Sequence, residues 1–383
     1  MKIQKILKRL LQLHPKSVDL SLDRIKRLLK DLDNPQEKIT NAVQVVGTNG
    51  KHSFCSTLRE IIETAGYTVN LNISPSLKKF NERYYLAGKY ISDDQLHDLL
   101  IEVEKINHDQ SITFHEFICA CFFLVASRNK SDVNIIESGL FFRLDASNVL
   151  EKNIASVIMP IGIDHKDFLK KGTIDEIVYE KCAHLLGGSK IVISEQKNDV
   201  LEKIKRNISG NSSEKIIFGD NYHYKKNTNG FVYADKIGKM NLPLPNLLGD
   251  FQISNVSTAI ATTRNLTQFK ITEQHIKKAI TKIKSEGRLQ TITKGKLREC
   301  VAENNQILID GAHNSLAASA ISEYLETLGG GRKIFMVLGM MANKEHKEFI
   351  QIFKNRVHSI IALDIPNQIN FIQKEKLSKI AQS

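Results

Sequence analysis

Apolar runs and helix-like stretches alternate along most of the chain. The apolar runs are short and rich in Val and Ile, as in strands buried within a sheet, and they fall at 41–47, 132–139, 154–164 and 190–195. Helices are predicted between them at 51–65, at the almost wholly apolar 112–126, and at 173–186 with Thr173 as N-cap. Strands that alternate with crossover helices build a parallel sheet. The pattern therefore predicts an α/β fold with a mostly parallel sheet.

The pattern changes after residue 213. Short strands interrupted by polar residues at 214–248 predict an antiparallel patch, and a helix follows at 251–266. A second alternation has strands at 304–312, 333–340 and 359–365 and a helix at 315–331. We place a boundary near Glu286, which predicts domains at 1–285 and 286–383, the second small for an independent α/β domain.

The N-terminus resembles an amphipathic helix and not an export signal. Residues 1–13 mix Lys and Arg with Leu and Ile at helical spacing and contain no small-residue cleavage site. No apolar run approaches the roughly 18–20 residues that span a bilayer. We therefore expect a cytoplasmic protein without a membrane partner.

The cysteines include no CxxC pair, and their number is odd: Cys55, Cys119, Cys121, Cys182 and Cys300. This argues against a disulfide framework and a zinc site, and predicts buried thiols.

Basic residues outnumber acidic ones by 54 to 42, which gives a net charge of +12. Such a balance suits either nucleic acid or small anionic substrates. The chain shows no basic stripe with interleaved aromatic residues and contains no Trp. We therefore expect small-molecule substrates and no nucleic acid, and we expect a monomer.

The strongest chemical signal is the segment VVGTNGKHS at 45–53. An apolar strand enters a turn bounded by Gly47 and Gly50, and Lys51 then opens a helix. Glycines let backbone N–H groups approach a phosphate, and the helix N-terminus adds a favourable dipole. Lys51 is placed to contact the β- and γ-phosphates of a nucleotide. The alternative is a plain strand-to-helix turn that contains two glycines.

The loop is shorter than the general P-loop GxxxxGK and resembles the GTNGKGS loop of folylpolyglutamate and dihydrofolate synthases, a branch of the Mur ligase superfamily. Further segments resemble that family in order along nearly the whole chain. They are LSLDRIKRLLKDLDNPQ, NISPSLKKFNERYYLAGKYIS, DVNIIESGLFFRLDASNV, IGIDHKDFL with TIDEIVYEKCA, LLGDFQISNVSTAIA, EGRLQ, LIDGAHNSLAA and LGMMANKEHKEF. The chain is identified on these segments as a member of the family.

The resemblance implies an ATP-dependent ligase that adds L-glutamate to the carboxylate of a folate or of dihydropteroate through an acyl phosphate. It implies a large P-loop domain, a smaller Rossmann-like C-terminal domain, and ATP at their interface. The implied ATP contacts are Gly47, Thr48, Asn49, Gly50, Lys51, His52, Ser53, Asn255, Arg288 and Asp310. Of these, Asn255 is expected near the adenine, Arg288 at the γ-phosphate and Asp310 at the ribose.

Mg²⁺, at two sites, is the implied metal. Its implied ligands are Ser74, Glu137 at the end of a strand, and His165 at the end of the next strand. The lysine that matches Lys181 is carbamylated in the family, because a bare ammonium near two Mg²⁺ ions would be repelled; otherwise Lys181 is a solvated lysine. His313 resembles a residue near the incoming glutamate. Lys51, His165, Lys181 and Arg288 are the implied catalytic residues.

Several positions depart from the family pattern. His52, Phe141 and Phe142 replace glycines, and Ser76 and Phe251 replace histidines. The family's final strands have no counterpart here, so we expect a shortened second domain. These departures leave open the alternative of an inactive nucleotide-binding remnant of the family. A Mur-type peptidoglycan ligase, which shares the P-loop, is the second alternative.

Overall fold

The structure is a computed structural model that describes residues 2–16, 18–329 and 331–382, and its chain divides into two compact units. Unit 1 comprises residues 1–161, 178–246 and 254–284, and unit 2 comprises 162–177, 247–253 and 285–383. Two segments that precede residue 285 thus belong to unit 2. A division of function at residues 285/286 remains a prediction.

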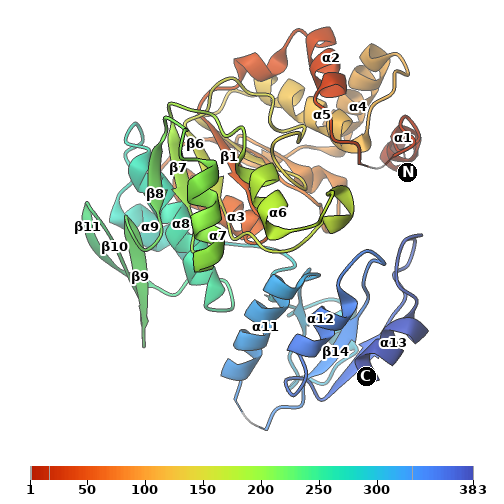
Figure 1. The fold of residues 1–383 in the computed structure, drawn as a ribbon, viewed down its shortest axis with the longest axis vertical. Helices are drawn as coiled ribbons and strands as arrows, with labels where there is room; N and C mark the ends of the chain where they lie inside the picture. Colours follow the sequence, from red (N-terminus) through yellow and green to blue (C-terminus); the bar gives the residue numbers. More distant parts are fainter. Residues whose placement is uncertain (1, 17, 330, 383) are drawn as a thin grey trace. The chain divides into compact units, whose positions relative to one another are not determined.

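Unit 1 is built on an eight-stranded sheet of order β4-β3-β2-β5-β1-β6-β7-β8 (Figure 1). Its strands are β1 (Ala42–Val46), β2 (Val69–Asn72), β3 (Tyr84–Leu86), β4 (Lys89–Tyr90), β5 (Val133–Glu137), β6 (Ala155–Ile158), β7 (Lys190–Ile193) and β8 (Glu214–Ile217). The pairs from β2 to β8 in this order are parallel, and the β2–β3 and β3–β4 pairs are antiparallel. The predicted α/β fold with a mostly parallel sheet is confirmed.

The central strand β1 explains the apolar run that begins the phosphate-loop motif. All five of its residues are buried, as expected for a parallel strand covered on both faces. In register, Val45 pairs with Glu137 on β5, and Val46 pairs with Ile158 on β6. The carboxyl ends of these three strands therefore meet at one edge, the place where α/β sheets bind ligands.

Helices cover the sheet of unit 1, and α6 and α7 lie in front of it in Figure 1. The helices that lie wholly or partly in this unit are α1 (Lys2–Leu10), α2 (Asp23–Asp31), α3 (Lys51–Thr64), α4 (Asp93–Asn107), α5 (Phe114–Arg128), α6 (Ile174–Cys182), α7 (Asn198–Asn207), α8 (Phe251–Asn265) and α9 (Glu273–Ile280), with short 3-10 turns η1 (Pro35–Lys38) and η2 (Phe80–Arg83). Residues of α1, α2, α4 and α5 share one apolar core. The predicted helices at 51–65, 112–126 and 251–266 are confirmed. The predicted cap of α6 is also present, because Thr173 Oγ1 accepts a hydrogen bond of 3.3 Å from Glu176 N.

One part of the predicted antiparallel patch is wrong. Strand β8 joins the main sheet in parallel with β7, whereas β9 (Tyr222–Asn227), β10 (Gly230–Asp235) and β11 (Gly238–Pro243) form a separate three-stranded antiparallel sheet. As an edge strand, β8 buries only part of its length and so lacks a continuous apolar run.

All five cysteines are free thiols, but Cys300 is exposed, against the expectation that all are buried. Cys300 directly follows the short α10 (Lys296–Glu299), which buries no residue.

The antiparallel sheet is tied to α8 by an ion pair. Arg264 donates from Nε to Asp235 Oδ2 at 2.6 Å and from Nη2 to Asp235 Oδ1 at 2.9 Å. Burial acts to raise the pKa of Asp235, but the hydrogen bonds from Arg264 outweigh it, and the pKa lies below its ordinary value.

We expect Asp235→Asn to lower the free energy of unfolding by about 3 kcal/mol at pH 7, because it leaves a largely buried arginine without its counter-charge. A carboxyl group whose pKa is depressed in the folded state stabilises the protein above its ordinary pKa of about 4, and this stability is lost as the pH falls toward the folded value. Urea unfolding at pH 7 and at acid pH should therefore show the gap between wild type and variant narrowing in acid. A gap that does not depend on pH would contradict this account.

Unit 2 contains a small α/β core. Its elements in 285–383 are β12 (Gln290–Thr291), α10, β13 (Leu308–Ile309), α11 (Ser315–Thr327), β14 (Phe335–Leu338), α12 (His346–Ile352), β15 (Ser359–Ala362) and α13 (Lys374–Gln382). β14 and β15 pair in parallel, and α11, α12 and α13 pack with them around one apolar cluster. The predicted strand at 304–312 is reduced to β13, which pairs with β12 in antiparallel fashion. The predicted helix at 315–331 ends at Thr327, and Gly330 lies outside the described residues.

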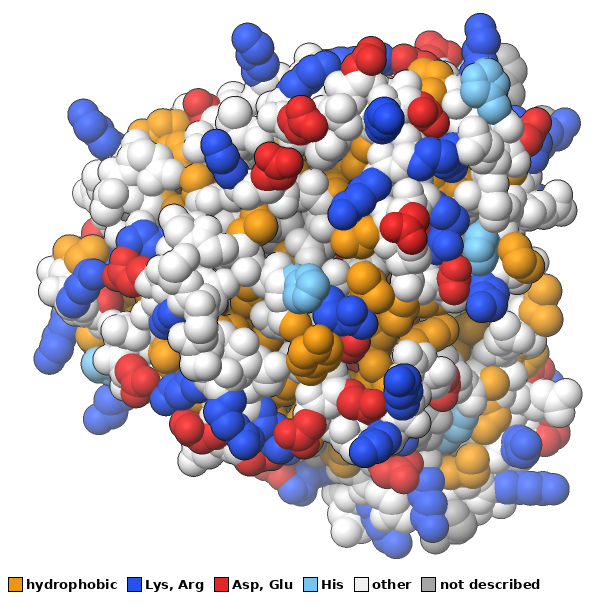
Figure 2. All heavy atoms as spheres, turned by 45° about the horizontal axis from the view of Figure 1, so that its top comes forward, with side chains coloured by type: hydrophobic (Ala, Val, Ile, Leu, Met, Phe, Trp, Pro, Cys, Tyr) orange, Lys and Arg blue, Asp and Glu red, His pale blue; other side chains and the backbone are white. Residues whose placement is uncertain are grey.

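The surface drawn in Figure 2 shows Lys and Arg side chains interspersed with Asp and Glu, not gathered into a stripe.

Among the helices that the structure describes, none is both long enough and apolar enough to cross a bilayer.

Candidate functional site

The predicted phosphate loop connects β1 to α3 at the carboxyl edge of the sheet. Gly47 and Gly50 have φ angles of 151° and 79°, in the region that favours glycine. A Cβ atom at Gly47 would lie 2.7 Å from Met159 Cβ, so the loop closely approaches the segment after β6. The loop is held there by Pro160 O, which accepts hydrogen bonds from Thr48 N at 2.9 Å and Asn49 N at 3.1 Å.

Lys51 begins α3, and its side chain turns back over the loop. Its Nζ donates to Gly47 O at 3.0 Å and to Thr48 O at 3.4 Å. The side chain is only half-buried, so its ammonium group is accessible beside the first turn of α3. Helix N-termini present backbone N–H groups suited to an anion. A cation at this position can therefore share an anion with the helix.

The structure brings Asn255 to the same loop. A Cβ atom at Gly50 would lie 2.5 Å from Asn255 Oδ1, which places the buried side chain of Asn255, on α8, directly against the turn. His52 and Ser53 lie in the first turn of α3, His52 half-buried and Ser53 buried.

Two of the three predicted metal ligands lie together in unit 1. Ser74, which follows β2, donates its backbone N–H to Glu137 Oε2 at 3.1 Å. Glu137 ends β5 and is 3% exposed. A carboxylate and a hydroxyl oxygen are hard donors of the kind Mg²⁺ prefers, so this pair fits the metal.

His165 is placed differently from the prediction. β6 ends at Ile158, and His165 lies in the loop beyond it, with a φ angle of 55°. It belongs to unit 2, whereas Ser74 and Glu137 belong to unit 1. Among the described residues, no cluster of three or more His, Cys, Asp or Glu side chains could hold a metal.

Lys181, on α6, is buried and not solvated. It is 1% exposed, and its Nζ donates to Gly47 O at 3.0 Å and to Leu140 O at 2.6 Å. Lys51 and Lys181 therefore contact the same carbonyl group at the start of the phosphate loop. The Phe141 ring lies 5.5 Å from Lys181 Nζ, a cation–π distance.

Phe141 and Phe142, which replace the family's glycines, are both 1% exposed. The Phe142 backbone N–H donates to Glu180 O at 3.0 Å, so this turn is fastened to α6. Phe141 also lines a small cavity in unit 1, here named the acceptor cavity. Its walls are Val18, Asp19, Leu20, Ser21, Thr113, His115, Glu116, Leu140, Phe141, Leu144, Asp145 and Ala146.

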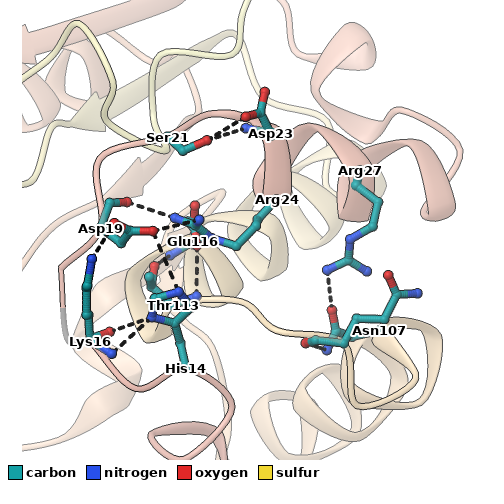
Figure 3. Close-up of polar contacts among 11 residues, drawn as sticks. His14, Lys16, Asp19, Ser21, Asp23, Arg24, Arg27, Asn107, Thr113 and Glu116 are labelled. Carbon is teal, nitrogen blue, oxygen red and sulfur yellow. Dashed lines mark hydrogen bonds and ion pairs between the residues drawn. The ribbon is translucent and has the colours of Figure 1, made fainter.

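The polar wall of the acceptor cavity is held by Arg24. Figure 3 shows Arg24 between Asp19 and Glu116, with Nε 3.0 Å from Glu116 Oε2 and Nη1 2.9 Å from Asp19 Oδ2. Glu116 Oε2 also accepts from Thr113 N at 2.8 Å, whereas Oε1 is buried without a hydrogen-bond partner among the described residues. One carboxylate oxygen is thus fixed, and the other is left for a hydrogen-bond donor.

His115 lies in the wall of this cavity beside Asp145. Its Nε2 lies 3.3 Å from Asp145 Oδ2 and 3.8 Å from Cys119 Sγ. Burial acts to lower the pKa of His115, but its contacts with Cys119 and Asp145 outweigh burial and place the pKa well above its ordinary value. Asp145 is itself fixed by Ser147 Oγ at 2.6 Å. The sequence did not indicate His115 or Asp145 as site residues, because the cavity is built from segments far apart in the chain.

Unit 2 gathers its charged residues around Asp164. This carboxylate accepts hydrogen bonds from Lys344 Nζ at 2.6 Å, Asn314 Nδ2 at 3.1 Å and His165 N at 2.8 Å, and it lies 3.1 Å from His313 Nε2. Burial acts to raise the pKa of Asp164, but these partners hold it well below its ordinary range. The sequence analysis missed Asp164 and Lys344, although the DHKD and NKE segments that contain them carry charged side chains.

Arg288 and Asp310 are joined through the backbone. Asp310 Oδ2 accepts from Leu289 N and its Oδ1 from Ala312 N, both at 2.7 Å. Arg288 Nη1 donates to Gly287 O at 2.9 Å, and a Cβ atom at Gly311 would lie 2.8 Å from the same Nη1. The two predicted ATP contacts of unit 2 are therefore neighbours.

Comparison with known families identifies one domain. The model of the Mur ligase glutamate ligase domain matches residues 287–382. Comparison with curated proteins finds the dihydrofolate synthase/folylpolyglutamate synthase of Buchnera aphidicola subsp. Acyrthosiphon pisum, 30% identical over 320 residues, which cover 82% of this chain and 72% of that protein.

Solved structures resemble the chain over its whole length. Escherichia coli FolC in complex with DHPP and ADP has a TM-score of 0.88 at 25% identity, covering 99% of this chain and 87% of that one. A bifunctional folylpolyglutamate synthase/dihydrofolate synthase with Mn, AMPPNP and L-glutamate bound has a TM-score of 0.84 at 25% identity, covering 98% and 86% of the two chains.

Proposed function

The chain belongs to the folylpolyglutamate/dihydrofolate synthase family of the Mur ligase superfamily, and we propose that it joins L-glutamate to the carboxylate of a folate or of dihydropteroate with hydrolysis of ATP. The observation that carries the proposal is the carboxyl edge of the unit 1 sheet. There the phosphate loop with Lys51 and the Ser74–Glu137 pair come from strands that are direct neighbours or lie one strand apart.

The chemistry requires two transfers. An acceptor carboxylate oxygen attacks the γ-phosphorus of ATP, ADP leaves, and an acyl phosphate forms. The amine of glutamate then attacks the acyl carbon, phosphate leaves with its bonding pair, and the nitrogen loses a proton to solvent. Mg²⁺ bound by Ser74 and Glu137 would offset charge on the phosphates. Lys51 would position the β- and γ-phosphates and neutralise charge as the bond to ADP breaks.

The other predicted contacts are residues of unit 2. Arg288 stays the predicted contact of the γ-phosphate, Asp310 of the ribose, and His313 of the incoming glutamate. His165 stays a predicted metal ligand. A second Mg²⁺ site, a carbamate on Lys181, a monomeric state and a cytoplasmic location also remain predictions.

The acceptor cavity is our candidate for the ring system of the acceptor. Phe141, Leu140 and Leu144 give it apolar walls that suit a flat ring. Glu116 Oε1 offers a buried acceptor without a partner among the described residues, which suits the N–H groups of a pterin. Phe141 thus belongs to substrate recognition in this proposal and does not by itself indicate lost activity.

The test is glutamate-dependent release of ADP, measured with dihydropteroate and with tetrahydrofolate in separate reactions that contain Mg²⁺. We expect turnover with at least one acceptor and none when glutamate is omitted. ADP release that is indifferent to both acceptors and to glutamate would favour the nucleotide-binding remnant over the ligase.

A further inference from the structure

Arg83 is a partly buried cation that forms no ion pair among the described residues. It ends η2 and directly precedes β3. Its Nε is buried without a hydrogen-bond partner, and its guanidinium forms no ion pair with the residues that the structure describes. Removing a charged group from water without compensation is costly. An anionic ligand would supply the missing partner.

The backbone of Arg83 lies beside the predicted metal ligands. Arg83 O accepts hydrogen bonds from Ile73 N at 3.2 Å and from Asn72 Nδ2 at 3.3 Å. The residue after Ile73 is Ser74, whose N–H contacts Glu137. Arg83 is therefore fixed at the edge where the phosphate chemistry is proposed.

The side chain of Arg83 is linked to the acceptor cavity. Its guanidinium lies 5.1 Å from the centre of the Phe80 ring, and Phe80 packs edge-on against Phe114 with 6.1 Å between ring centres. Phe114 lies in the chain between Thr113 and His115, which both line the cavity. A series of direct contacts thus connects Arg83 to the cavity wall on one side and to the Ser74–Glu137 pair on the other.

The electrostatic surroundings agree with this placement. Burial lowers the pKa of Arg83 below its ordinary value, and the charge on Glu137 acts in the opposite direction. Both side chains therefore lie in one poorly solvated region. Arginine stays charged there, because its guanidinium is not deprotonated under ordinary protein conditions.

We infer that Arg83 binds the acceptor carboxylate that becomes the acyl phosphate and directs it toward the Ser74–Glu137 edge. A planar guanidinium can donate two parallel hydrogen bonds to a carboxylate, which fixes its orientation as well as its charge. With the ring system in the acceptor cavity, the carboxylate end would extend toward this arginine. The inference rests on the proposed function and adds a preference for charged acceptors. An acceptor that lacks the carboxylate charge should bind no more tightly because of Arg83.

Calorimetry with two ligands tests the inference in the presence of AMPPNP and Mg²⁺. The ligands are dihydropteroate and its analogue in which a carboxamide replaces the carboxylate. We expect Arg83→Ala to weaken dihydropteroate binding roughly 10- to 100-fold, the range for losing hydrogen bonds to a charged group, and to leave carboxamide binding unchanged. Arg83→Gln keeps a polar side chain but removes the charge, and it should weaken dihydropteroate binding in the same way. It replaces the alanine variant if that variant does not fold.

Arg59→Ala is the matched control. Arg59 also has a buried Nε without a hydrogen-bond partner among the described residues, and its guanidinium lies 4.5 Å from the Tyr85 ring, but it lies 3.6 Å from its counter-ion Glu63. Loss of the Arg59 side chain should change the affinity neither for dihydropteroate nor for its carboxamide analogue. Equal affinity of wild type and both Arg83 variants for dihydropteroate would overturn the inference and leave the ligase intact. Wild-type protein that binds neither ligand would overturn the proposed acceptor, and Arg83 with it.

Discussion

Lys51→Ala is expected to reduce glutamate-dependent ADP release by at least about 100-fold, the usual cost of removing one donor that stabilises charge in a transition state. In this structure the Lys51 ammonium group donates hydrogen bonds to two carbonyl groups of the loop, those of Gly47 and Thr48. The proposed role of Lys51 is to contact the phosphates of ATP. The loss should therefore appear in turnover and in the binding of AMPPNP, measured by calorimetry.

The same substitution should cost little stability. Lys51 is half-buried at a helix terminus, and the buried Gly47 O keeps its hydrogen bond from Lys181, so the loss should cost only about 1 kcal/mol. Thermal melts of Lys51→Ala and wild type should nearly coincide. Lys239→Ala, an exposed lysine on β11, removes the same charge far along the chain and should change neither turnover nor the melt. If Lys51→Ala keeps near-normal turnover, the phosphate loop is only a strand-to-helix turn.

The phosphate loop could be predicted from sequence because its signal is local. A fully buried strand, two glycines with left-handed φ angles, and a helix that starts at the lysine all follow one another within 42–64. Each step follows from steric or burial rules that apply to neighbouring residues.

The cluster around Asp164 could not be predicted in this way. Its partners His313 and Lys344 lie 149 and 180 residues further along the chain. One sequence without covariation does not reveal such a contact, and a buried aspartate resembles an exposed one in the sequence. The error at β8 has a related cause, since the four residues of this partly buried edge strand do not reveal whether its neighbour is parallel or antiparallel.

Arg83 and Glu116 show a second reason why sequence analysis falls short. Each matters because a polar atom is buried without a partner among the described residues, and burial depends on what packs around it. Arg83 even lies within a segment that resembles the family, yet its type alone predicts a solvated surface arginine. Only the packed structure separates the two possibilities.

Lys181→Ala is expected to impair both stability and activity, unlike Lys51→Ala. It removes a side chain that is 1% exposed and leaves Gly47 O and Leu140 O without its ammonium group. A cavity together with lost buried hydrogen bonds should lower the free energy of unfolding by about 3 kcal/mol. Because Gly47 begins the phosphate loop, turnover should fall as well. Lys205→Ala, which breaks only surface ion pairs with Glu202 and Asp220, is the control and should leave the free energy of unfolding nearly unchanged.

The carbamate prediction adds a separate signature to the same variant. A carbamate carries negative charge, so it would be repelled by the two carbonyl groups that the ammonium contacts, and the lysine side chain would have to turn away from them. If this form is the active one, wild-type turnover should depend on bicarbonate, and acetate should restore part of the activity of Lys181→Ala without restoring its melting temperature. Turnover measured in bicarbonate-depleted buffer, with and without acetate, separates the two roles. Wild type that is indifferent to bicarbonate, together with a variant that acetate does not rescue, would leave Lys181 as the buried ammonium that holds the phosphate loop in place.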